Sequence, residues 1–240
     1  KGLFKGENGT GKTIFACSAA AHGRVYVADC DGRMGSVATY YKDQPEVLNN
    51  IEYDSFKDFY KLETKIKELS VNCPYYLVII SSLTSEARML MRQALNLRGE
   101  GKGSVQAGGV FINTVEDFNV ETAGIVQTII DRCIYSLNAH FVLEAHVMEV
   151  TYRDIKGATH ISRRLLTGGK QIAAELPGYF DEVYHFNIDR SNPTESKYTV
   201  VTQHVGDDFA KTSLGLPKVV DFTGKNGWSI IEPYLKGGGK

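Results

Sequence analysis

The sequence lacks the features of exported, membrane-spanning or strongly charged proteins. Its four cysteines lie far apart and form no C-x-x-C pair, which argues against a disulfide framework and against a zinc site. No apolar run approaches the roughly 20 residues that a helix needs to span a bilayer, and no signal sequence opens the chain. The formal net charge of -1 creates no overall positive field toward nucleic acid or membrane. We therefore expect a soluble protein of a reducing cytoplasm, in which any site for a polyanion is local.

The sequence does have an ordinary globular composition and a regular alternation of strand and helix patterns. Its 240 residues are 42% hydrophobic and 23% charged, which suits one domain with a full core. Apolar and β-branched runs predict strands at residues 3–5, 24–29, 51–53, 75–81 and 141–145, and further strands beginning at 182 and 197. Apolar residues at helical spacing predict helices at residues 10–21, 56–69, 87–95, 120–137 and 170–176.

Two of these helices have a predicted apolar face. Asp54 or Ser55 is expected to cap the helix at 56–69, and Tyr60 is expected on its buried side. Ala123 and Ile130 are expected in the buried stripe of the helix at 120–137. The polar, basic stretch at 147–167 is expected to be a loop.

The alternation of strands and helices predicts an α/β fold with a doubly wound, mainly parallel sheet. The C-terminal strands are expected to extend this sheet in the antiparallel direction, and a ligand is expected at the carboxyl ends of the parallel strands. We expect one domain at residues 1–236 and a Gly-rich tail at 237–240.

One phosphate-binding motif satisfies every fixed position of G-x-x-x-x-G-K-S/T, between a predicted strand and a predicted helix. It consists of Gly6, Glu7, Asn8, Gly9, Thr10, Gly11, Lys12 and Thr13. Glycines let the backbone turn its N–H groups toward phosphate oxygens, and the start of the following helix adds a positive dipole end. Lys12 is expected on the β and γ phosphates and Thr13 on Mg²⁺. The motif predicts a P-loop that binds ATP or a similar nucleotide with Mg²⁺.

Polar residues at three strand ends are candidates for the rest of the site. Asp29 and Asp31 end one strand, where a carboxylate can orient the attacking water; the alternative is a turn that caps the next helix. Ser81 stands where an acidic residue normally supports Mg²⁺, so a neutral hydroxyl is the predicted metal-site group there. His146 can hydrogen-bond the γ phosphate, and the alternative is a histidine of the core.

The order of these segments resembles the RecA-like branch of P-loop ATPases, most closely the phage-encoded AAA-type nucleotide-binding proteins, which include phage RecA/RadA-like recombination and single-strand annealing ATPases. The resemblance lies in G-E-N-G-T-G-K-T at 6–13, V-A-D-C-D at 27–31, Y-Y-L-V-I-I-S-S-L-T at 75–84, H-F-V-L-E-A-H at 140–146 and F-A-K-T-S-L-G-L-P at 209–217. It implies a RecA-like fold, a water-activating role for Asp31, and location in the host cytoplasm of a phage-encoded protein.

The resemblance also implies a contact between subunits of a ring or filament. The segment at 211–215 is similar to an element whose basic residues reach a neighbouring subunit's nucleotide, which makes Lys211 a candidate catalytic residue. Ser213 stands where that element carries Arg, and a lysine supplies only a point charge. This departure and Ser81 both predict slow hydrolysis.

RecA-like proteins bind DNA through two loops, and the matching segments here are 98–113 and 147–167. Their candidate nucleic-acid residues are Arg98 and Lys102 in the first, and Tyr152, Arg153, Lys156, Arg163 and Arg164 in the second. The alternative for both segments is a solvated surface loop.

Three functions follow from these features. The first is an ATP-dependent protein of phage DNA recombination or replication that forms a homo-oligomer and binds single-stranded DNA. The second is a nucleotide-binding switch or assembly component that hydrolyses ATP slowly or not at all. The third, a small-molecule phosphoryl transferase, ranks last because the sequence shows no lid for an acceptor.

Overall fold

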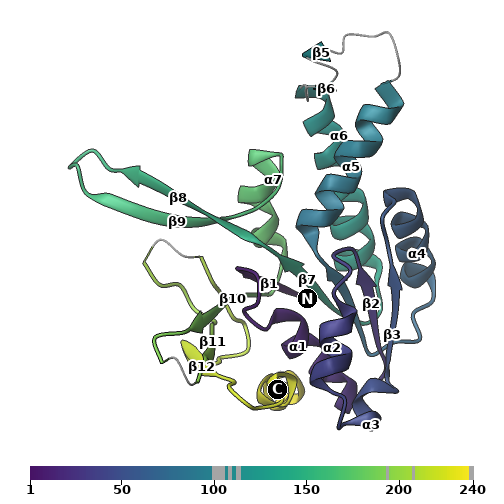
Figure 1. Ribbon diagram of the computed structural model, residues 1–240, viewed down its shortest axis with the longest axis vertical. Coiled ribbons are helices and arrows are strands. Elements are labelled where there is room, and N and C mark those ends of the chain that lie inside the picture. Colours follow the sequence, from purple (N-terminus) through teal and green to yellow (C-terminus); the bar gives the residue numbers. More distant parts are fainter. Residues whose placement is uncertain (99–105, 108–109, 112–114, 193–194, 207–208, 238–240) are drawn as a thin grey trace.

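An eight-stranded sheet forms the centre of the computed structural model, which describes residues 1–98, 106–107, 110–111, 115–192, 195–206 and 209–237 (Figure 1). The strand order is β12 (Val219–Asp221), β11 (Lys197–Val201), β10 (Glu182–Asp189), β1 (Gly2–Gly6), β7 (His140–Ala145), β4 (Leu77–Ser81), β2 (Val25–Asp29) and β3 (Ile51–Ser55). All neighbours from β10 to β3 are parallel, whereas β11 and β12 run antiparallel. The predicted mainly parallel sheet with antiparallel C-terminal strands is confirmed.

Helices cover both faces of this sheet. One face packs against α1 (Lys12–Cys17), η1 (Ser18–Ala21), α2 (Met34–Tyr40), α3 (Pro45–Leu48) and α8 (Gly227–Gly237). The other face packs against α4 (Phe59–Val71), α5 (Leu83–Arg98), α6 (Val115–Ile125), η2 (Val126–Ser136) and α7 (Lys170–Glu175). Central β4 is fully buried between the two layers, which explains its continuous apolar run. The carboxyl ends of the parallel strands therefore meet at one edge that the helices leave accessible.

The segment at 147–167 forms a hairpin, so its prediction as a loop was wrong. β8 (Val147–Arg153) pairs antiparallel with β9 (Thr159–Leu165), and the two strands project from the body of the molecule (Figure 1). Polar and apolar residues occur on both faces of the hairpin, most of whose side chains are at least partly exposed, whereas Leu165 at its base is buried in the core. Residues 148–153 (M-E-V-T-Y-R) do alternate between apolar and polar, which is a strand signal, whereas the partner strand at 159–165 shows no such alternation and its basic residues favour a loop.

The ends and faces of two helices differ from the predictions. Asp58, rather than Asp54 or Ser55, caps α4 by accepting a hydrogen bond from the Lys61 N–H at 3.1 Å, and Tyr60 is 68% exposed. The buried stripe of α4 consists of Phe59, Leu62, Ile66 and Leu69, and Tyr60 lies off this stripe. The predicted long helix consists of α6, which continues as the π-helix η2. Ile130 of η2 is buried as predicted, whereas Ala123 of α6 is exposed. A π turn shifts the helical phase, so one stripe cannot fit both halves.

The remaining elements are short or belong to the C-terminal segment. They are β5 (Gln106–Ala107), β6 (Val110–Phe111) and η3 (Leu176–Tyr179). The sequence patterns did not predict α8, whose Trp228 and Ile231 are buried against the sheet. Gly237, where the predicted tail begins, is the last residue of α8, and the rest of that tail lies outside the described residues. In the part of the chain that the structure describes, no helix is long and apolar enough to cross a membrane.

Candidate nucleotide site

Glycines shape the loop that joins β1 to α1. Gly9 and Gly11 have φ angles of 76° and 85°, in the left-handed region that favours glycine. Gly6 packs against β10 so closely that a Cβ there would come within 2.5 Å of the Phe186 carbonyl oxygen. α1 begins at Lys12, so its first N–H groups have no helical carbonyl partner and face the loop. The loop thus has the shape and the backbone donors of a phosphate cradle.

Lys12 lies buried beneath this loop. Its side chain is 5% exposed, and Nζ donates to the carbonyl oxygens of Gly6 at 3.0 Å and Glu7 at 2.8 Å. Burial lowers the pKa of Lys12 to about 8, although nearby Glu144 and Asp31 act in the opposite direction. The remaining partner of Lys12 Nζ is the Thr10 hydroxyl at 3.5 Å, so an ammonium held only by neutral oxygens would gain a stronger, charge-assisted partner in a phosphate oxygen.

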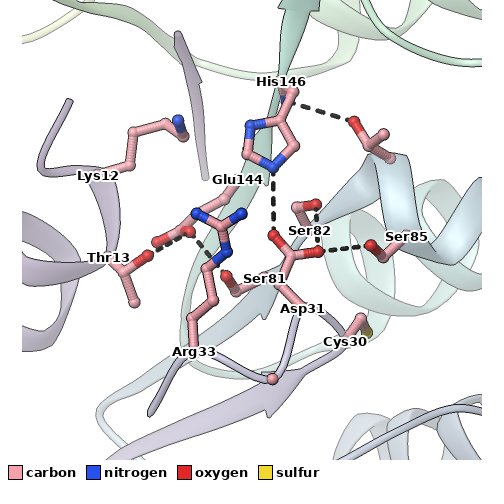
Figure 2. A network of polar contacts seen from close by, with 12 residues as sticks. Lys12, Thr13, Cys30, Asp31, Arg33, Ser81, Ser82, Ser85, Glu144 and His146 are labelled. Carbon is pink, nitrogen blue, oxygen red and sulfur yellow. Dashed lines mark hydrogen bonds and ion pairs between the residues drawn. The ribbon is translucent and has the colours of Figure 1, made fainter. Parts of the chain in front are cut away.

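Thr13 and Ser81 share one buried carboxylate, that of Glu144 on β7 (Figure 2). The Thr13 hydroxyl donates to Glu144 Oε2 at 2.7 Å, and the Ser81 hydroxyl donates to the same oxygen at 2.8 Å. β7 lies between β1 and β4, and Glu144 is in register with Ser81, which places the carboxylate between the two hydroxyls. Burial raises the pKa of Glu144, and Lys12 acts in the opposite direction.

The two aspartates after β2 have different environments. The Asp29 carboxylate accepts hydrogen bonds from the N–H groups of Gly32, Arg33 and Met34, at 2.8, 3.1 and 3.3 Å, and so closes the turn that leads into α2. This is the helix-capping alternative left open for the pair. Asp31 instead accepts from the hydroxyls of Ser82, at 3.1 Å, and Ser85, both at the start of α5.

Asp31 also faces His146, which directly follows β7. His146 Nε2 lies 3.2 Å from Asp31 Oδ2, and the Thr84 hydroxyl accepts a hydrogen bond from the His146 backbone N–H at 3.4 Å. Burial by itself would raise the pKa of Asp31, but the hydrogen bonds from His146 and Ser85 lower it to about 2. The carboxylate is therefore ionised throughout the physiological pH range. Asp31 and His146 line a cleft of about 500 Å³ together with Glu7 of the loop, so the structure brings the loop and these two candidate catalytic residues to one cavity.

A comparison with protein families identifies the domain. A family model described as an AAA domain matches residues 1–214. The chain belongs to the AAA domain family. It contains a P-loop ATPase domain, whose nucleotide loop, helices and strand-end residues are those described above. The narrower resemblance to phage recombination proteins stays a prediction.

Two further comparisons add little to this assignment. A KaiC-like protein from the hyperthermophilic archaeon Pyrococcus horikoshii OT3 aligns with a TM-score of 0.48 and 14% sequence identity, over 92% of this chain and 88% of that chain. A similarity at this level carries no argument about function. A search of curated proteins gives no match to the sequence.

The residues of this ATPase domain fit a nucleotide with a divalent cation. Thr13 offers a hydroxyl ligand, and Glu144 Oε1 is a buried oxygen with no hydrogen-bond partner. Among the residues that the structure describes, no three His, Cys, Asp or Glu side chains cluster as a complete metal site. Mg²⁺ in P-loop proteins needs no such cluster, because phosphate oxygens and waters supply most of its ligands.

The sequence reasoning missed three charged side chains of the site. Glu144 was hidden inside an apolar strand pattern, although an acidic residue in such a run, two residues before His146 and on the same side of the strand, is itself a signal. Arg33 and Arg88 line the cleft with Asp31, and Figure 2 shows Arg33 extending toward the space between Glu144 and Asp31. Both arginines give the cleft positive charge next to the phosphate loop.

Lys211 lies away from this cleft in its own chain. Its Nζ donates to the Gly178 carbonyl oxygen at 3.2 Å, and its backbone pairs with Val183 beside β10. Ser213 donates through its N–H and its hydroxyl to the Glu182 carboxylate. A role of Lys211 at the nucleotide of a neighbouring subunit stays a prediction.

The predicted DNA-binding residues of the second segment all lie on the β8–β9 hairpin. Arg153, Lys156 and Arg164 are exposed. Arg163 forms an ion pair with Glu149 on the opposite strand, at 2.9 Å. Tyr152 is 41% exposed and stacks on the His160 ring at a centroid distance of 5.2 Å.

The first predicted DNA-binding segment gives no such information. Lys102 and the side chain of Arg98 lie outside the part of the chain that the structure describes.

Proposed function

We propose that this domain hydrolyses ATP with Mg²⁺ and couples the nucleotide state to binding of single-stranded DNA. One observation carries the coupling: the β8–β9 hairpin begins at Val147, directly after His146, and His146 contacts Asp31 in the nucleotide cleft. A displacement of His146 on loss of the γ phosphate therefore acts on the first residue of the hairpin.

Lys12, Asp31 and Thr13 have distinct parts in hydrolysis. Lys12 binds the β and γ phosphates and compensates their charge. Asp31 orients the attacking water rather than keeping its proton, because a carboxylate with a pKa of about 2 is a weak base. The water oxygen bonds to the γ phosphorus, the bond to the β–γ bridging oxygen breaks, and the proton leaves with the phosphate product. Mg²⁺, when bound at Thr13, stabilises the charge that develops on the phosphate oxygens.

The hairpin offers both kinds of group that bind single-stranded DNA. Arg153, Lys156 and Arg164 supply exposed positive charge for phosphates, and Tyr152 supplies an aromatic face for stacking. Arg163 contributes less, because Glu149 already neutralises it. The resemblance to phage ATPases supports a place in phage DNA recombination or replication, as a ring or filament of identical subunits.

The experiment is a salt titration of single-stranded DNA binding, followed by the fluorescence anisotropy of a labelled oligothymidylate. The slope of the logarithm of the association constant against the logarithm of the salt concentration is negative. In the triple variant Arg153→Ala, Lys156→Ala and Arg164→Ala it should become shallower by about 2, since each lost phosphate contact removes about 0.7. A matched control replaces the exposed Lys57, Lys61 and Lys67 near and on α4 with Ala, which removes the same charge far from the hairpin.

Two outcomes would contradict DNA binding through the hairpin. One is the absence of binding at low salt, with and without ATP. The other is an equal loss of affinity in the hairpin variant and in the α4 control, because the effect would then follow net charge alone.

A slow nucleotide switch or assembly component is the second candidate. Ser81 in place of an acidic residue and Ser213 in place of Arg favour it, since Ser213 is bonded to Glu182 within its own chain. Steady-state hydrolysis with and without single-stranded DNA separates the two functions. A rate that DNA does not change favours the switch.

A further inference from the structure

The domain has no carboxylate at the end of β4, where P-loop ATPases normally carry the acidic residue that supports the cation. β4 ends at Ser81, and Ser82 follows it. A hydroxyl carries no charge to hold a metal-bound water. If the domain uses Mg²⁺, another described residue must supply that charge.

Asp29 and Asp31 do not fill this role. Asp29 is occupied by three backbone N–H groups of the turn that leads into α2. Asp31 bonds Ser82, Ser85 and His146, none of which is the residue expected on the cation, whereas Thr13 bonds Glu144.

Glu144 has the position and the free oxygen that the role requires. Its Oε2 holds the Thr13 and Ser81 hydroxyls together, so the carboxylate touches both the loop residue expected on the cation and the strand end that lacks an acid. Its Oε1 is buried and has no hydrogen-bond partner. Lys12 does not satisfy Oε1, because its three ammonium donors go to the carbonyl oxygens of Gly6 and Glu7 and to the Thr10 hydroxyl. A buried carboxylate oxygen without a partner is costly, and a cation or its bound water would remove that cost.

The order of the strands explains how a residue on another strand reaches this place. β7 is hydrogen-bonded to β1 on one side and to β4 on the other. Glu144 is the register partner of both Phe4 on β1 and Ser81 on β4. A side chain on β7 can therefore reach toward the loop after β1 and toward the end of β4.

We propose that Glu144 supplies the carboxylate of the magnesium site, and that Ser81 has become a neutral partner that hydrogen-bonds it. The acidic function has moved from the end of β4 to the neighbouring strand β7. This inference rests on the proposed nucleotide-dependent activity, and it concerns which residue supports the cation.

The test compares the affinity for a fluorescent, non-hydrolysable ATP analogue in Mg²⁺ with the affinity in EDTA. The wild type should bind more tightly in Mg²⁺, and Glu144→Gln should reduce that ratio by about 10- to 100-fold, the usual effect of losing a group that supports a metal ligand. The amide of Gln keeps an oxygen for Thr13 and Ser81, so circular dichroism should show a folded protein. The double variant Ser81→Asp, Glu144→Gln should regain the ratio, because the charge returns to the β4 end.

Asp31→Asn is the matched control, since it removes a neighbouring negative charge from the same cleft. An equal loss of the Mg²⁺ ratio in Asp31→Asn and Glu144→Gln would overturn the inference, as would an unchanged ratio in Glu144→Gln. A wild-type protein that binds the analogue in neither condition contradicts the proposed function itself. Equal wild-type binding in both conditions overturns only the role of Glu144.

A second variant tests the geometry without nucleotide. In Ser81→Asp the new carboxylate faces Glu144 across registered strands, and the two like charges should lower the melting temperature. Mg²⁺ alone should raise that melting temperature more in Ser81→Asp than in the wild type. Equal shifts in both proteins would mean that Glu144 does not face a cation site.

Discussion

Replacing the buried Glu86 with Gln should make the stability of the fold less dependent on pH between pH 5 and 8. Glu86 lies in the first turn of α5, fully buried, and neither carboxylate oxygen has a hydrogen-bond partner. Burial raises the pKa of Glu86 from 4.5 to about 8. The folded protein therefore keeps a proton on Glu86 that the unfolded chain loses at much lower pH.

The sign and size of the effect follow from this difference. The contribution of protonated Glu86 to the free energy of unfolding is fully present below the unfolded pKa of 4.5. It falls as pH rises and stops falling above the folded pKa of about 8. Each pH unit in this window costs about 1.4 kcal/mol. Between pH 5 and 8 the free energy of unfolding of the wild type should fall by about 3.5 kcal/mol relative to Glu86→Gln, slightly less than for three full pH units because the slope is smaller near each pKa. Gln keeps the size and polarity of the side chain but cannot ionise.

The assay is urea unfolding followed by circular dichroism at pH 5, 6, 7 and 8. The control is Glu68→Gln on the exposed side of α4, for which the difference from the wild type should stay within about 0.5 kcal/mol at every pH. If the free energies of unfolding of the wild type and Glu86→Gln differ by the same amount at every pH, the reasoning is refuted. Such a constant difference would mean that the folded protein ionises Glu86 as easily as the unfolded chain does.

Three further predictions concern the nucleotide loop, the cleft and α8. Lys12→Ala should weaken ATP binding at least about tenfold, because a hydrogen bond to a charged group contributes about 1.5–3 kcal/mol; calorimetry measures the affinity, and unchanged binding would contradict a P-loop role. Asp31→Asn should keep its contacts with the serines but lower kcat by about 100-fold or more with little change in ATP affinity, which single-turnover hydrolysis measures; an unaltered rate would remove Asp31 from catalysis. Gly227→Ala should lower the melting temperature, since the new Cβ would lie 2.2 Å from the Phe15 ring, and overpacking of this kind costs about 1–3 kcal/mol. A melting temperature equal to the wild type would mean that α8 shifts freely on α1.

The parallel sheet and the phosphate loop follow from local sequence signals. Residues 75–81 are almost continuously apolar because β4 is buried on both faces, and that pattern needs no knowledge of its neighbours. The P-loop motif is likewise contained within eight consecutive residues. Such features can be predicted because the physical cause and the sequence signal lie in the same segment.

The features that sequence reasoning missed depend on contacts between distant segments. Glu144 could not be assigned from β7 alone, because its partners Thr13 and Ser81 come from two other strand ends. Asp29 bonds the turn that follows it, whereas Asp31 bonds serines at the start of α5, far away in the sequence. A pattern of two acids cannot show this difference. The hairpin at 147–167 escaped prediction although residues 148–153 alternate between apolar and polar, because its second strand at 159–165 has no such pattern and is recognisable only by its pairing with β8.

Contacts between its two strands favour movement of the β8–β9 hairpin as one rigid unit. Glu149 and Arg163 form an ion pair across its two strands, and Tyr152 stacks on His160 nearer its tip, so the two strands are tied together along their length. Seven extended residues span about 23 Å, and a rotation of about 10° at His146 would move the far end by about 4 Å. A small rotation beside the nucleotide cleft would thus move the hairpin tip by about the spacing between two neighbouring residues of a strand.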